Sequence, residues 1–133
     1  MKVWYSAAIL LGVMADSSPS HAQQQEITAS CSTRQTVGSR DRLACTTAPT
    51  VVRAPAEHVF VEKSAKGGRT RGYGSAQDCR LSWSDPVEVL PGTGIAQPTA
   101  AILVAHARAA GGRFSVRGWV ECKYTFNVVK YSR

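Results

Sequence analysis

The C-terminal third of the chain alternates between two kinds of residue with a period of two. From Phe114 to Val128 every even-numbered position is apolar or small, whereas the odd-numbered positions through Asn127 are polar except for Trp119. Successive side chains of a strand point to opposite faces, so this pattern predicts a half-buried β-strand. The alternation persists for longer than a typical strand, so we expect a bend or bulge at Gly118.

The preceding segment, residues 99–110, is expected to fold back onto this strand. Its many alanines favour a helix, but its large apolar residues at 102–104 are contiguous and lack helical spacing. The Gly-Gly pair at 111–112 can form a two-residue hairpin turn, which would set Leu103 opposite Val120. This register buries one shared apolar face, and we therefore predict an antiparallel hairpin.

The other face of this hairpin suggests a binding site. The same register would place Arg117 beside His106 and would leave Trp119 on their side of the ribbon. An aromatic ring can stack on a sugar, while adjacent cations bind carboxylate or phosphate groups. The alternative is that the N-terminal segment, through residues 51–52, covers Trp119 as part of the core. We take Trp119, Arg117 and His106 as candidate ligand-binding residues.

Two further alternating segments predict strands. "HVFVEKSAK" indicates a strand over residues 58–64. "DCRLSWSD" places Cys79 and Trp83 on one face, so we expect Trp83 to pack in the core.

Between these segments lies "GGRTRGYG", residues 67–74, which has four glycines in eight residues. This glycine content predicts a loop. Loops on a rigid sheet often carry binding residues, so Arg69, Arg71 and Tyr73 are further candidate ligand contacts. Arginine, glycine and an aromatic can also bind single-stranded nucleic acid, but one short copy is a weak signal and nucleic acid is not the expected partner.

The N-terminus resembles a secretory signal. A short basic start, an apolar run at residues 3–14 and small residues before position 23 predict a signal peptide over residues 1–22. The apolar run is shorter than the roughly 20 residues that span a bilayer as a helix. We expect a secreted or periplasmic protein with an irregular segment at 23–56, which carries a disulfide loop, and an antiparallel β domain at 57–133.

The chain contains four cysteines: Cys31, Cys45, Cys79 and Cys122. An even number in a small exported chain predicts two disulfides, although four cysteines permit three pairings. We favour Cys31–Cys45, which closes a short polar loop, and Cys79–Cys122, which joins two separate strands. No C-x-x-C occurs, so a zinc knuckle is not indicated. The expected fold is all-β: a small antiparallel β-sandwich or partly closed barrel stapled by two disulfides.

Charge and motifs bound the function only broadly. The formal net charge of +7 suits an anionic partner, or it serves solubility alone. No nucleophile elbow, phosphate loop or H-E-x-x-H motif occurs, and the sequence indicates no catalytic residue, metal or cofactor. We expect a non-catalytic binding protein for an anionic glycan or cell-envelope component.

Two alternatives remain open. A protein-interaction module, such as an inhibitor or an assembly subunit, would present an apolar patch around Ile102, Val104 and Trp119. A small hydrolase would hold His58 or His106 in a cleft beside an acidic partner.

Overall fold

The computed structural model describes residues 23–89 and 94–131, so the predicted signal peptide over residues 1–22 lies outside the described residues. Strands dominate these ranges, and the elements follow in chain order. They are β1 (Gln23–Ser32), β2 (Arg42–Thr46), β3 (Thr50–Arg53), β4 (His58–Phe60), the 3-10 turn η1 (Glu62–Ser64), β5 (Lys66–Tyr73), β6 (Ala76–Glu88), β7 (Ala96–Ala110) and β8 (Trp119–Lys130).

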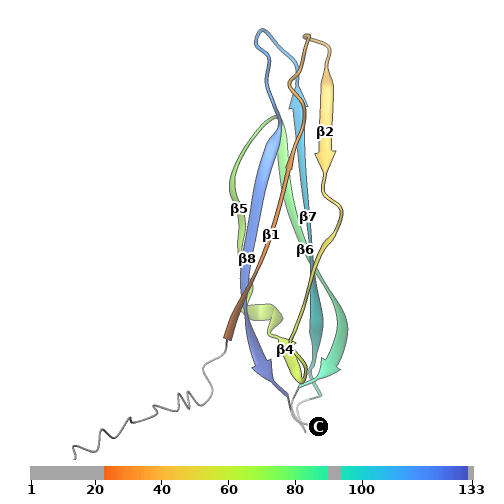
Figure 1. Cartoon of the computed structure of the whole chain (residues 1–133), viewed down its shortest axis with the longest axis vertical. Coiled ribbons are helices and arrows are strands. Elements are labelled where there is room, and N and C mark those ends of the chain that lie inside the picture. Colours follow the sequence, from red (N-terminus) through yellow and green to blue (C-terminus); the bar gives the residue numbers. More distant parts are fainter. Residues whose placement is uncertain (1–22, 90–93, 132–133) are drawn as a thin grey trace, which may run out of the picture.

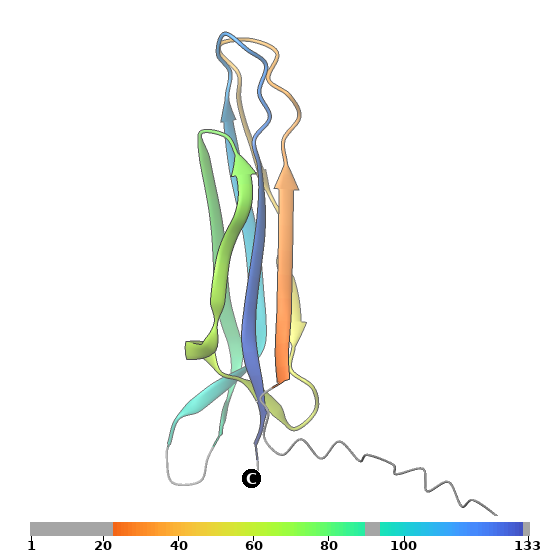
Figure 2. The same ribbon diagram turned by 90° about the vertical axis from the view of Figure 1, so that its left-hand side faces the viewer.

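Each of two antiparallel sheets is built around one long central strand. In sheet A, β8 pairs with β1 along one edge and with β5 and β4 along the other. In sheet B, β7 pairs with β2 and β3 along one edge and with β6 along the other. The two sheets pack face to face as an elongated β-sandwich (Figures 1 and 2). The predicted all-β sandwich is therefore confirmed.

The predicted hairpin between the last two strands is wrong. Residues 99–110 do form a strand, but β7 and β8 belong to different sheets, and residues 111–118 connect one sheet to the other. Leu103 and Val120 are both fully buried, as expected. They lie in opposite sheets of the core, however, and not on neighbouring strands of one sheet. The alternation correctly identifies which face is buried. It does not distinguish a neighbour beside the strand from a strand in the opposite layer.

The start of β8 also differs from the prediction. The alternating pattern begins at Phe114, five residues before the first paired residue of β8. Phe114 therefore lies outside the strand, and it is 76% exposed. Gly118 lies just before β8 and forms no bulge within it. The irregularity in register lies in the neighbouring strand β5, between Arg69 and Arg71.

The glycine-rich segment at residues 67–74 was expected to be a loop, but it forms most of β5. Gly67 has a φ of +137°, and a Cβ at this position would overlap the carbonyl oxygen of Lys123 in β8. Glycine therefore permits the close approach of the two backbones instead of ending the strand.

The N-terminal part is likewise more regular than expected. Residues 23–56, predicted to be irregular, contain β1, β2 and β3. In β1 only one face needs apolar residues, and Ile27 and Ala29 supply it. Near the middle of the chain, the strand expected over residues 58–64 ends at Phe60, and η1 follows.

The core is closed by an aromatic cluster and two disulfides. Phe126 lies 4.6 Å from Phe60 and 5.3 Å from Trp83 between ring centroids, so the prediction that Trp83 packs in the core is confirmed. The predicted disulfides Cys31–Cys45 and Cys79–Cys122 are also both present. The first joins β1 to β2 and the second joins β6 to β8, so each one links sheet A to sheet B.

Candidate functional site

The outer face of sheet A, turned away from sheet B, gathers most of the predicted binding residues. Register in the sheet decides this arrangement: Tyr73 of β5 pairs with Trp119 of β8, and Arg71 pairs with Glu121. The irregularity after Arg69 brings Arg71 onto the same face as Glu121, because Arg69 pairs with the inward-facing Cys122.

Trp119, the first residue of β8, lies on this face beside charged neighbours. The guanidinium carbon of Arg71 lies 5.9 Å from the centroid of the Trp119 ring, within the range of a cation–π contact. Arg71 also donates a hydrogen bond from Nε to Oε2 of Glu121 at 2.5 Å. Arg117, Trp119 and Ser30 line a hollow of about 360 Å³ beside this pair. The result is a partly buried ring bordered by two arginines.

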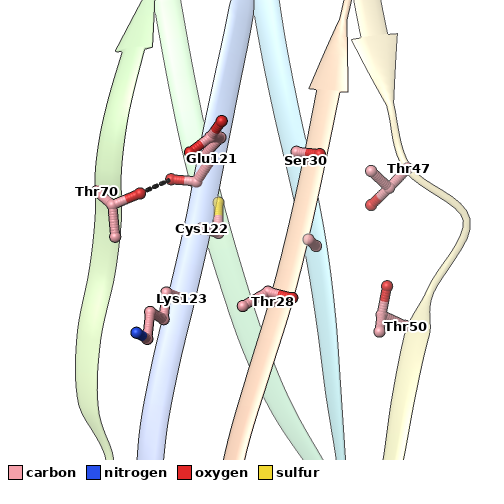
Figure 3. Close-up of a pocket in the computed structure, with 9 residues that line it drawn as sticks. Thr28, Ser30, Thr47, Thr50, Thr70, Glu121, Cys122 and Lys123 are labelled. Carbon is pink, nitrogen blue, oxygen red and sulfur yellow. Dashed lines mark hydrogen bonds between the residues drawn. The ribbon is translucent and has the colours of Figure 1, made fainter.

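A second hollow, of about 480 Å³, continues this surface and is rich in hydroxyl groups (Figure 3). The two hollows share Ser30 and Glu121. Other polar side chains come from β1, β5, β8, the segment that joins β2 to β3, and the start of β3: Thr28, Thr70, Lys123, Thr47 and Thr50. We call Trp119, Arg71, Arg117 and Tyr73, together with this hydroxyl-lined hollow, the sheet A site.

In the second hollow, some hydroxyl groups already bond to the backbone, whereas others are available to a ligand. Thr70 donates to the backbone carbonyl of Glu121 at 3.2 Å, and the hydroxyl of Thr47 accepts from the amide of Ala105 at 3.0 Å. The hydroxyl groups of Thr28 and Ser30 make no hydrogen bond to another residue in the described part of the chain.

The ion pair beside Trp119 predicts a pH effect. The hydrogen bond from Arg71 lowers the pKa of Glu121 below its ordinary value of 4.5. The pair therefore stabilises the fold above that value, and the contribution is lost as pH falls through the lowered pKa. A carboxyl ¹³C NMR titration should give a Glu121 midpoint below 4.5, and R71A should raise it. A midpoint that R71A leaves unchanged would contradict this assignment.

His106 does not join the sheet A site, contrary to the predicted pairing with Arg117. It lies on the outer face of sheet B, in a hollow of about 410 Å³ that Arg80 and Asp78 also line. The reason is the separation of β7 from β8, which places their outer faces on opposite sides of the molecule. Arg69 is also separate from the site, since its guanidinium donates to Oε1 of Gln77.

The bonds of the His106 ring limit its chemistry. Arg108 Nε lies 3.2 Å from His106 Nε2, and Thr46 Oγ1 lies 2.7 Å from Nδ1. An arginine nitrogen can only donate, so Nε2 accepts and Nδ1 carries the hydrogen that it donates to Thr46. In this arrangement the imidazole cannot take a proton from Thr46, so the two do not form a base and nucleophile pair.

His58 bonds to the backbone, and the residues expected to form an interaction patch lie on different sheets. Nδ1 of His58 lies 2.7 Å from the carbonyl oxygen of Ala56, two residues earlier in the chain. Ile102 and Val104 face outward from sheet B, whereas Trp119 faces outward from sheet A, so the three residues do not form one patch. Within residues 23–89 and 94–131, no group of three or more His, Cys, Asp or Glu residues could hold a metal ion.

The hydroxyl groups of β1 were missed from the sequence because this segment was expected to be irregular. The segment "EITASCS" does alternate, with Ile27 and Ala29 facing inward and Thr28 and Ser30 facing outward. A period of two over seven residues was the signal that could have revealed them.

Comparisons with known proteins do not assign the chain to a family. No family model, no curated protein and no solved structure matches it. Among the described residues, no helix is long and apolar enough to cross a membrane.

Proposed function

We propose that this chain is an exported, non-catalytic protein that binds an anionic glycan at the sheet A site. The observation that carries the proposal is the position of Trp119. The ring contacts Arg71 and lines one hollow together with Arg117, and that hollow adjoins the hydroxyl-lined hollow through Ser30 and Glu121.

The residues of the site match the chemistry of a charged sugar. The apolar face of a pyranose ring stacks on an indole, and hydroxyl side chains exchange hydrogen bonds with sugar hydroxyl groups. Arg117 makes no ion pair or hydrogen bond with another described residue, so its guanidinium is available to a carboxylate, sulfate or phosphate. Because the two hollows share Ser30 and Glu121, the surface suits more than one sugar unit.

Export is supported by two independent features. Both disulfides cross between the sheets, and such bonds persist in oxidising compartments. The residues at 1–22 also have the composition of a signal peptide. A secreted or periplasmic location would give the site access to envelope polysaccharides.

The site predicts how substitutions change glycan affinity. W119A removes the stacking surface and should weaken binding about tenfold or more, because burying an aromatic side chain contributes roughly 1.5–3 kcal/mol. The double variant W119A/R117A should lose binding at the concentrations that saturate the wild type. A glycan array of neutral, carboxylated and sulfated oligosaccharides, followed by calorimetry on the best ligand, provides the measurement.

A matched control uses the opposite face of the sandwich. Ile102 and Arg80 face outward from sheet B, so I102A/R80A also removes one large apolar group and one arginine. This variant should retain wild-type affinity. Glycan binding that survives W119A/R117A and is lost in I102A/R80A would place the site on the other sheet and overturn the proposal.

A further inference from the structure

One end of the sandwich is formed by two loops, residues 33–41 and 111–118. In both views these loops lie side by side, at the end opposite to the start of β1 and the end of β8 (Figures 1 and 2). We call these two loops, together with Arg42 at the start of β2, the tip.

Asp41 and Gly111 fix the outer part of the tip. The Asp41 carboxylate accepts hydrogen bonds from the amides of Val37 at 2.6 Å and Gly38 at 3.3 Å, and these bonds lower its pKa. The amide of Gly111 donates to the carbonyl of Asp41 at 2.8 Å. A Cβ at Gly111 would overlap the Gly38 carbonyl oxygen, so the two loops are in direct contact.

Two buried threonines fix the inner part. Thr33 Oγ1 accepts from the amide of Gly118, and Thr36 Oγ1 accepts from the amide of Val116, each at 3.0 Å. Both threonines are nearly inaccessible to solvent. The tip is therefore an organised structure whose outer residues have defined positions.

This organised tip exposes two large apolar side chains. Val37 is 83% exposed and Phe114 is 76% exposed, the two highest values among the large hydrophobic residues of the described chain. Neither side chain contributes to the core. Their hydrophobic surface is therefore free to be buried against something else.

The tip is also strongly basic. Its arginines flank the two apolar side chains in sequence: Arg34, Arg40, Arg42, Arg113 and Arg117. The only acid among residues 33–42 and 111–118 is Asp41, whose carboxylate already caps the amides of the loop. The tip thus carries five positive charges and one negative charge, against a net charge of +7 for the whole chain.

We propose that the tip binds an anionic lipid surface, with Phe114 and Val37 inserted among the lipids and the arginines on their phosphate groups. Exposed apolar side chains combined with cationic residues are typical of segments that enter the boundary between headgroups and acyl chains. A stable protein partner would bury roughly 800 Å² of total surface on each side, far more than two side chains provide. The tip lies at the opposite end of the sandwich from the start of β1 and the end of β8.

This proposal is independent of glycan binding, although Arg117 lies at the border between the tip and the sheet A site. The test therefore leaves Arg117 unchanged and measures co-sedimentation with vesicles. Phosphatidylcholine vesicles that contain about one-third phosphatidylglycerol should bind the protein, and pure phosphatidylcholine vesicles should bind it much more weakly.

The variants separate the apolar contribution from the charge. F114S should weaken binding about tenfold or more, because the variant no longer transfers a phenylalanine side chain from water into the lipid. R40Q/R113Q should weaken it about fivefold for each arginine removed. V51S, at an exposed residue of β3, and R53Q/R80Q, with the same change in charge, serve as controls and should bind like the wild type.

Three outcomes would overturn the proposal. One is wild-type binding by F114S or by R40Q/R113Q, with folding confirmed by thermal melting. Another is equal binding to vesicles with and without phosphatidylglycerol. The last is release from vesicles by millimolar glycerol phosphate, which would show recognition of a free phosphate group without insertion.

Discussion

Replacing Phe126 with alanine is expected to destabilise the protein by about 3–5 kcal/mol. The ring is 1% exposed and packs edge-on against both Phe60 and Trp83, so its removal leaves a cavity between the sheets. The measurement is the free energy of unfolding from chemical denaturation, with the disulfides intact in both proteins.

The chain offers a matched control for this substitution. F114A removes the same ring from a residue that is 76% exposed, and it should change the free energy of unfolding by less than about 0.5 kcal/mol. Equal effects of F126A and F114A would contradict the assignment of the aromatic cluster to the core.

Removing the two disulfides separately is expected to give unequal losses of stability. The bond between Cys79 and Cys122 spans 43 residues, and C79A/C122A should lower the free energy of unfolding by about 4 kcal/mol. The bond between Cys31 and Cys45 spans 14 residues, and C31A/C45A should lower it by about 3 kcal/mol. The reason is that a longer closed loop restricts the unfolded chain more.

Denaturant unfolding of both double variants at one temperature provides the comparison. A loss of several kcal/mol is a large part of the stability of a domain of this size, so each variant should also melt at a lower temperature. A smaller loss from C79A/C122A than from C31A/C45A would indicate that native packing, and not loop length, governs the contribution of these bonds.

The alternating pattern in the sequence predicted burial well but strand neighbours poorly. Leu103, Val120 and Cys122 are all buried, as their spacing indicated. The Gly-Gly pair favoured a tight hairpin, yet Gly111 instead contacts Gly38 in the other loop of the tip. A strand can bury one face against an opposite sheet as readily as within its own, and this choice depends on long-range contacts that local spacing does not encode.

For the binding residues, too, the sequence was informative about local spacing and not about which strands lie side by side. Trp119 and Arg117 line one hollow, although Arg117 precedes β8 and lies outside the strand on which the pattern relied. Arg71 lies on the same face as Trp119 only because the register of β5 against β8 shifts after Arg69. No residue pattern in the sequence predicted this shift. His106 was assigned to the same face from the hairpin register, and the separation of the sheets removed it.

The pairing of the strands has a consequence for how the chain matures after synthesis. Among the described strands, each of β1–β6 pairs only with β7 or β8, which are the last two to be made. During synthesis from the N-terminus, the first six of these strands are therefore made before the strand with which each of them pairs. Productive assembly must wait for residues 96–130, and a nascent chain truncated before β7 has no template on which to organise.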